Sequence, residues 1–280
     1  MEPTPDIASN PAPACRVSGV SVSYESTGVL LDVSLAFPAG GCTIIMGPSG
    51  SGKSTLLKAA AGLVVPDEGE VEVLGVDPMR ATDRELEALR VRNGFVFQDG
   101  ALWQNMTLYQ NLALPLEYHR LEPDADARRR RVERLVRELG ATTRLHLRPA
   151  QVSAGERKIV SFIRALICEP DLVFLDEPTT SVDAERVDLM VRRLKALRKQ
   201  RRTIIAVTHD ARIASQMADY LALMKQGRLL AFGTLAEISR SGDPEIERIL
   251  TDVLSETATY DGDILDLLNP ESEPFSRNSN

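Results

Sequence analysis

The most constraining feature of the sequence is the segment GPSGSGKST at 47–55. The apolar run TIIM before it predicts a short buried strand, and KSTLLKAAAGL predicts a helix that begins inside it. A glycine-rich loop in this position presents backbone N–H groups and a helix N-terminus to an anion. The segment therefore predicts a phosphate-binding loop in an α/β fold. Its residues are Gly47, Pro48, Ser49, Gly50, Ser51, Gly52, Lys53, Ser54 and Thr55.

Two side chains of this loop have separate predicted tasks. Lys53 would bridge the β- and γ-phosphate oxygens of a bound nucleotide, and the Ser54 hydroxyl would ligate Mg²⁺. The alternative is a flexible turn that contains these letters by chance. The strand before the loop and the helix after it make that alternative a poor one.

A second pair of candidate residues follows the apolar run LVFL at 172–175. Asp176 and Glu177 come at the carboxyl end of this predicted strand, where parallel sheets place their ligands. Asp176 is expected to hold Mg²⁺, and Glu177 to orient and polarise an attacking water as general base. A purely structural role explains the pair poorly, because burying two adjacent acids unpaired is costly.

The rest of the pattern predicts a largely parallel α/β core with two additions. Alternating apolar residues at 17–24 and 30–37 predict antiparallel strands, and FVFQ at 95–98 predicts a buried strand. Thr82 with Glu85 predicts a capping box before a short helix. Helical patterns dominate from about 99 to 165, and strands and helices alternate again afterwards. We therefore expect a mostly parallel core, an N-terminal antiparallel β subdomain and an inserted α-helical subdomain. The predicted divisions are a disordered leader at 1–14, a nucleotide-binding domain at 15–252 and an acidic tail at 253–280.

Composition narrows the class of protein. The 280 residues are 43% hydrophobic, so a substantial hydrophobic core is possible. The net charge of -7 does not indicate that the chain as a whole binds nucleic acid. The arginine runs at 128–131 and 192–202 fall at helical spacing, which favours a solvated helix face. The three cysteines lack CxxC spacing, and no apolar run reaches the roughly 18 residues that span a bilayer. We expect a protein of the reducing cytosol.

Several motifs in order resemble the ATP-binding subunit of an ATP-binding-cassette (ABC) transporter. They are Tyr24, GPSGSGKST, Gln98, VSAGE at 152–156, LVFLDEP, SVD at 181–183 and His209. The resemblance covers roughly residues 15–240 and implies a P-loop NTPase core of the RecA type. It also implies that the chain binds ATP and Mg²⁺ and hydrolyses ATP.

The resemblance implies a role for each matching residue. Tyr24 would stack on adenine, the alternative being an ordinary strand tyrosine. Gln98 would touch Mg²⁺ and the attacking water and relay the nucleotide state to a membrane partner. Asp183 falls in the loop that crosses the dimer interface. His209 would sense the γ-phosphate, and its place directly after TIIAV favours this role over a structural one.

The segment VSAGE departs from the family signature LSGGQ. In the family this segment lies at a helix N-terminus and contacts the γ-phosphate bound by the opposite subunit. Alanine at the third position would cost about 1 kcal/mol where a positive φ is needed, and would be harmless in a helical first turn. We favour the harmless case and an active enzyme, because the predicted catalytic residues are present. The signature residues here are Ser153, Ala154, Gly155 and Glu156.

Partners follow from the same resemblance. Each ATP is held between the Lys53 loop of one subunit and the Ser153 loop of the other, which implies a dimer, with two identical copies expected. The dimer would dock on an integral-membrane permease dimer at the cytoplasmic face of the inner membrane. ATP binding would close it and hydrolysis would open it. No nucleic-acid partner is expected.

Residues 95–119, FVFQDGALWQNMTLYQNLALPLEYH, bear on the transported substrate. They resemble the ATPases of Mce-type lipid transporters, including the Mla phospholipid system, although Trp103 stands where that group usually has phenylalanine. This implies an Mce-domain substrate-binding protein and a small regulatory subunit as further partners. An importer of amino acids or other small solutes is the main alternative, and a soluble or regulatory ABC protein with little turnover is another. By analogy with relatives, Tyr260 and residues 264–268 are expected to dock on the opposite subunit.

Overall fold

The computed structural model describes residues 12–250. Its strands are β1 (Cys15–Tyr24), β2 (Thr27–Phe37), β3 (Cys42–Met46), β4 (Glu68–Val73), β5 (Asn93–Val96), β6 (Leu172–Asp176), β7 (Thr203–Val207), β8 (Tyr220–Lys225) and β9 (Arg228–Gly233). Its helices are α1 (Lys53–Ala60), α2 (Asp83–Arg92), α3 (Leu108–Tyr118), α4 (Ala125–Glu138), α5 (Ala154–Leu166), α6 (Ala184–Lys199), α7 (Ala211–Met217) and α8 (Leu235–Ser239), with a 3₁₀ turn at Pro149–Gln151.

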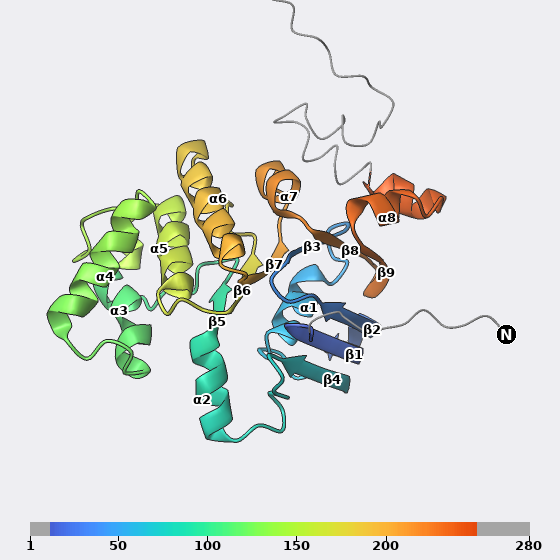
Figure 1. The fold of residues 1–280 in the computed structure, drawn as a ribbon, viewed down its shortest axis with the longest axis horizontal. Coiled ribbons are helices and arrows are strands. Elements are labelled where there is room, and N and C mark those ends of the chain that lie inside the picture. The colour runs from blue at the N-terminus through green and yellow to red at the C-terminus, as the bar shows by residue number, and fades with distance from the viewer. Residues whose placement is uncertain (1–11, 251–280) are drawn as a thin grey trace, which may run out of the picture.

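The strands form two sheets (Figure 1). The larger sheet has the order β5-β6-β7-β3-β8-β9, and its strands are parallel except β9, which is antiparallel to β8. The smaller sheet, β2-β1-β4, is antiparallel throughout. The predicted α/β fold, with a mostly parallel core and an N-terminal antiparallel β subdomain, is confirmed.

Two hydrophobic cores cover the two faces of the larger sheet. Val173 and Leu175 of β6 point into the core beneath α3 to α7, whereas Leu172 and Phe174 point into the core shared with α1 and the smaller sheet. Successive strand residues face opposite sides of a sheet. The central strands β3, β6 and β7 are therefore buried at every position, because both of their faces are covered.

Helices α3, α4 and α5 gather in one lobe beside the larger sheet (Figure 1). The predicted capping box at the start of α2 is present, since Thr82 accepts from the Glu85 N–H at 3.4 Å and Glu85 accepts from the Thr82 N–H at 2.8 Å. A second box, of Thr107 and Gln110, begins α3. It fixes where the lobe starts, about ten residues after Val96 ends β5.

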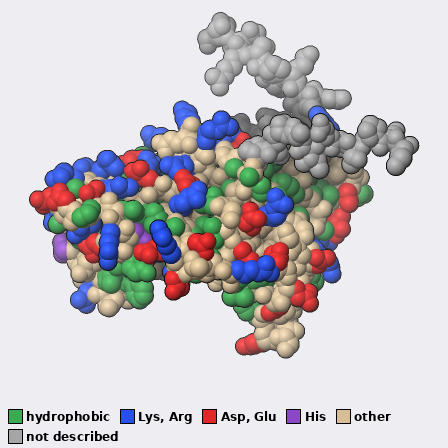
Figure 2. Space-filling model, turned by 60° about the horizontal axis from the view of Figure 1, so that its bottom comes forward, with side chains coloured by type: hydrophobic (Ala, Val, Ile, Leu, Met, Phe, Trp, Pro, Cys, Tyr) green, Lys and Arg blue, Asp and Glu red, His purple; other side chains and the backbone are tan. Residues whose placement is uncertain are grey.

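Two arginines of α4 donate hydrogen bonds to backbone carbonyls instead of facing water alone. Arg128 donates to the Glu122 carbonyl at 2.8 Å, and Arg131 donates to the Ile167 carbonyl at 2.9 Å. Their side chains are only 16% and 21% exposed, so the expected solvated face is wrong for these two residues. Figure 2 shows basic and acidic side chains interspersed on the surface in view. Arg131 thereby ties α4 to the C-terminal end of α5.

Parts of the predicted organisation fall outside residues 12–250. These are most of the leader at 1–14 and the acidic tail at 253–280, including Tyr260 and residues 264–268. Within the described range, none of the helices combines the length and the apolar character needed to cross a bilayer.

Candidate nucleotide-binding site

The predicted phosphate-loop, Mg²⁺-binding and general-base residues meet at one edge of the larger sheet. Strands β6, β7 and β3 are parallel neighbours, so their carboxyl ends lie together. The phosphate-loop segment follows β3, Asp176 and Glu177 end or follow β6, and His209 follows β7 by two residues. Residues separated by more than 150 positions in the sequence are therefore placed around one point, as the motif order predicts.

The loop between β3 and α1 curls around the ammonium group of Lys53. This group donates to the carbonyls of Gly47 at 2.8 Å and Pro48 at 2.9 Å. Pro48, Ser49 and Gly50 are exposed, while Thr55 lies in the first turn of α1. Gly50 has a φ of 75°, and a Cβ there would meet no atom within 4 Å, so its backbone conformation and the open space beside it suit the approach of a phosphate.

Ser54 and Asp176 form the part of the site that fits Mg²⁺. The Ser54 hydroxyl donates to Asp176 Oδ1 at 2.8 Å. Asp176 is fully buried, and its Oδ2 has no hydrogen-bond partner. Among the described residues, no group of three or more His, Cys, Asp and Glu side chains could hold a metal by itself. One carboxylate and one hydroxyl match Mg²⁺, which takes its other ligands from phosphates and water.

Glu177 and His209 contact each other at two points beside the carboxyl ends of β6 and β7. The His209 N–H donates to Glu177 Oε2 at 3.4 Å, and His209 Nε2 lies 3.4 Å from Glu177 Oε1. Glu177 has a φ of 47°, and its N–H donates to the Val207 carbonyl at 2.9 Å. A positive φ at a non-glycine residue is strained, and such strain clusters at functional sites.

Burial raises the pKa of the Glu177 carboxyl, and the neighbouring Asp176 raises it further. His209 and Lys53 act in the opposite direction and favour the carboxylate. A carboxylate with a raised pKa is a stronger base than a solvated one. The environment of Glu177 therefore suits the orientation and deprotonation of water.

Gln98 lies two residues beyond the end of β5, at the same edge of the sheet, and is exposed. The expected strand at 95–98 is wrong at its end, because β5 stops at Val96. Beyond that point the chain bonds to α5 instead of to β6: Lys158 donates to the carbonyls of Phe97 and Gln98. Lys158 was not predicted as a site residue, although a lysine within the apolar run of α5 was a visible signal.

The signature segment begins α5, with Ser153 as its N-cap. Ser153 Oγ accepts from the Glu156 N–H at 3.1 Å. Ala154 is exposed, opens the helix and has no positive φ. A Cβ on Gly155, in contrast, would lie 2.3 Å from the Ser181 carbonyl oxygen. Position 154 therefore tolerates alanine, as predicted, and the requirement for glycine falls on position 155.

Glu156 stands where the family signature has glutamine, and its carboxylate forms an ion pair. The Thr142 N–H donates to its Oε1, and Arg186 lies 3.1 Å from its Oε2. Arg186 also lies 3.6 Å from Asp183, whose carboxylate caps α6 by accepting from the Arg186 N–H at 3.0 Å. The signature helix and the Asp183 loop are thus joined within one subunit. Sequence alone did not indicate this network, since its members are about thirty residues apart.

Tyr24 ends β1 at the turn into β2 and is 50% exposed, so its ring is free to pack against a base. The smaller sheet is tied to the phosphate loop through Gly227, which donates to the Ser51 carbonyl at 3.1 Å and accepts from the Leu31 N–H at 2.8 Å. This link keeps the strand that follows Tyr24 against the loop.

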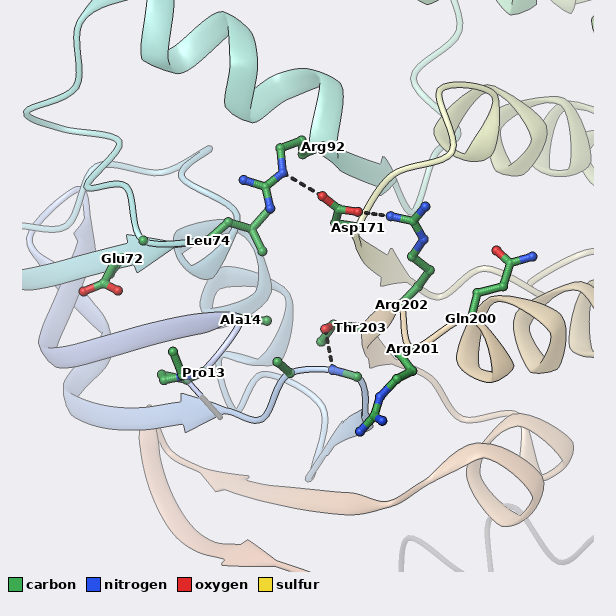
Figure 3. Close-up of a pocket in the computed structure, with 14 residues that line it drawn as sticks. Pro13, Ala14, Glu72, Leu74, Arg92, Asp171, Gln200, Arg201, Arg202 and Thr203 are labelled. Carbon is green, nitrogen blue, oxygen red and sulfur yellow. Dashed lines mark hydrogen bonds and ion pairs between the residues drawn. The ribbon is translucent and has the colours of Figure 1, made fainter. Parts of the chain in front are cut away.

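A hollow of about 500 Å³ lies at the opposite edge of the larger sheet (Figure 3). Asp171 and Thr203, at the start of β6 and β7, line it. Asp171 lies between Arg92, at 2.6 Å, and Arg202, and pairs with both. Parallel sheets bind ligands at the carboxyl ends of their strands, so this hollow is separate from the nucleotide site.

Comparisons with known proteins agree with this geometry. The family model described as ABC transporter matches residues 30–180. The Mycobacterium leprae protein named "Probable ribonucleotide transport ATP-binding protein mkl" is 33% identical over 239 residues, which are 85% of this chain and 68% of that protein. The Bacillus cereus "Sulfate/thiosulfate import ATP-binding protein CysA" is 36% identical over 226 residues, 80% of this chain and 62% of that protein. The chain thus spans about two thirds of the length of these relatives.

A solved structure of an ATP-binding cassette is also similar to this chain. A dimeric ATP-binding cassette in a post-hydrolysis state, bound to ADP and Pi, has a TM-score of 0.74 and 30% sequence identity to this chain. The match covers 79% of this chain and 98% of the solved one. With the family model matching more than half of its residues, the chain belongs to the ABC transporter family, and its described core is an ABC ATPase domain of the P-loop NTPase fold.

Proposed function

We propose that two copies of this chain form the ATP-hydrolysing engine of a membrane transporter whose cargo is phospholipid. The observation that carries the ATPase part is the cluster at one sheet edge: Ser54 bonded to Asp176, whose second oxygen has no partner, beside the Glu177–His209 pair. Such a cluster offers a metal position and a general base within one site.

Each residue has a defined role in the proposed hydrolysis. Lys53 exchanges its two loop carbonyls for β- and γ-phosphate oxygens, and the loop N–H groups cradle the β-phosphate. Glu177 orients the attacking water and accepts its proton, while His209 holds the carboxylate in place. Mg²⁺, held by Ser54, Asp176 and Gln98, would offset the phosphate charge. Tyr24 stacks on the adenine ring.

The dimer follows from the placement of the signature. Ser153 and Ala154 are exposed at the start of α5, and α5 lies in the helical lobe, on the other side of β6 and β7 from α1 (Figure 1). The signature is thus available to a γ-phosphate on a second copy, with Asp183 at the shared interface. The dimeric cassette bound to ADP and Pi supports this arrangement.

A membrane partner is supported by large apolar side chains that face water. Leu63 is 51% exposed, Val65 69% and Trp103 56%. Leu63 and Phe95 line a hollow of about 270 Å³ between α1, α2 and β5. Exposed apolar residues around a hollow mark interaction sites. We assign this surface to a helix of the permease dimer, which would keep the chain at the cytoplasmic face of the inner membrane.

Phospholipid is proposed as the cargo because residues 95–119 resemble Mce-type ATPases, which also implies an Mce-domain binding protein and a small regulatory subunit. The relatives named for ribonucleotide transport and sulfate or thiosulfate import support a second candidate, import of a small solute. The proposed divisions remain a leader at 1–14, a nucleotide-binding domain at 15–252 with its helical part at about 99–165, and a tail at 253–280 that docks on the second copy.

Reconstitution tests the cargo. The chain is copurified with its membrane partners, placed in phospholipid vesicles, and assayed for transfer of a fluorescent phospholipid to acceptor vesicles. We expect transfer that needs ATP and is lost with Glu177→Gln. ATP-driven uptake of sulfate or a ribonucleotide, with no lipid transfer, would contradict the lipid proposal and favour the second candidate. Absence of membrane partners after copurification would contradict both.

A further inference from the structure

Lys158 is a buried cation that reaches from the signature helix to the Gln98 segment. It lies five residues after Ser153 on α5, and its side chain is almost completely buried, at 4% relative exposure. Its ammonium donates to the Phe97 carbonyl at 3.2 Å and to the Gln98 carbonyl. An ammonium group is costly to bury without partners, so these two carbonyls account for its position.

The carboxylates of the nucleotide site affect the pKa of Lys158. Burial lowers the pKa of Lys158, and the carboxylates of Asp176, Asp99 and Glu177 oppose that effect. The ammonium therefore lies in the field of the proposed metal ligand and of the proposed general base. Its charge faces the catalytic edge of the sheet from the side of α5.

Arg164, six residues further along α5, binds the next part of the same segment. Its guanidinium donates to the Ala101 carbonyl at 2.8 Å and to the Gly100 carbonyl at 3.1 Å. The segment also closes on itself, since the Gly100 N–H donates to the Phe97 carbonyl at 3.0 Å. Four backbone carbonyls between residues 97 and 101 are thus bound by two cations of one helix. A segment fixed at four points follows that helix as one body.

We propose that Lys158 is a positioning residue that sets Gln98 against the bound nucleotide and couples it to the signature. The inference rests on the proposed function, because the position of Gln98 matters only if Gln98 takes part in hydrolysis. The amide side chain of Gln98 serves the nucleotide site of its own subunit. Ser153, at the start of the helix that carries Lys158, serves the nucleotide site of the second copy. Lys158 joins the two, so a displacement of Gln98 by the permease moves Ser153 with it.

Kinetics of Lys158 variants, measured with the full chain and its membrane partner, test this inference. Lys158→Met keeps the length of the side chain and removes both hydrogen bonds. We expect kcat to fall about 10-fold or more while KM for ATP changes by less than about twofold, because misplacing a catalytic group slows chemistry more than it weakens binding. Lys158→Arg keeps the charge and the donors and should recover most of the loss. Lys199→Met, at the exposed end of α6, is the matched control.

A purely structural lysine would behave differently. If Lys158→Met keeps the wild-type kcat, or if kcat falls only in proportion to the folded fraction and Lys158→Arg does not restore it, the inference is overturned. Lys158→Gln, a neutral and shorter variant whose amide keeps two N–H donors, provides the same comparison if the methionine variant does not fold. Turnover of the wild-type chain in the same assay tests the proposed ATPase activity by itself. A failure of that activity is therefore distinguished from a failure of this inference.

Discussion

Replacing Glu177 with glutamine is expected to lower ATP turnover about 1000-fold while ATP binding is retained. Glutamine keeps the shape of the side chain and one oxygen, and therefore the contact with the His209 N–H at 3.4 Å. It cannot accept a proton from water, which is the proposed task of the carboxylate. Phosphate release in the steady state measures the turnover, and binding of a fluorescent ATP analogue measures the affinity.

The same variant should accumulate as a dimer when ATP and Mg²⁺ are present, since closure needs binding and reopening needs hydrolysis. Size-exclusion chromatography with light scattering detects this state. Lys53→Ala is the matched control and should lose both ATP binding and the dimer, because it removes the ammonium held inside the phosphate loop. Turnover of Glu177→Gln close to that of the wild type would show that another group is the base.

Gly155→Ala is expected to be the most damaging single-methyl change in the signature. The added Cβ would lie 2.3 Å from the Ser181 carbonyl oxygen, which no Cβ tolerates, so α5 or the segment at 181–183 must shift. Either shift displaces Ser153 or Asp183, the two residues proposed to face the second copy. We expect kcat to fall about 100-fold and the free energy of unfolding to fall by about 1 to 3 kcal/mol.

Ala154→Gly, one residue earlier, is the matched comparison. Ala154 is exposed in the first turn of α5 and lacks a positive φ, so restoring the family glycine should leave kcat unchanged. It should lower the free energy of unfolding by up to about 1 kcal/mol, because glycine is the poorer helix former. Chemical denaturation and the ATPase assay read the two effects. A several-fold rise in kcat would mean that Ala154 impairs the enzyme.

Features encoded by adjacent residues could be predicted from the sequence. The phosphate loop, the acids after LVFL and the Thr82 capping box each depend on residues that are neighbours along the chain, and the structure contains all three. The sheet edge could also be predicted, because the carboxyl ends of parallel strands meet there.

Contacts between distant residues could not be predicted. Lys158 binds carbonyls about sixty residues away, and Glu156 pairs with Arg186 thirty residues further along. Nothing in the local pattern distinguishes Arg128 and Arg131, which are mostly buried, from their exposed neighbours in the same run. These partners are fixed by how α4 and α5 pack in the helical lobe, which periodicity does not specify.

The most direct test of the account is the rate of ATP hydrolysis by the purified wild-type chain, alone and with its membrane partner, with and without Mg²⁺. The account predicts Mg²⁺-dependent turnover well above that of Glu177→Gln, with VSAGE acting as a working signature. ATP binding without turnover, even with the partner present, would contradict it and would identify the chain as a regulatory ATP-binding subunit.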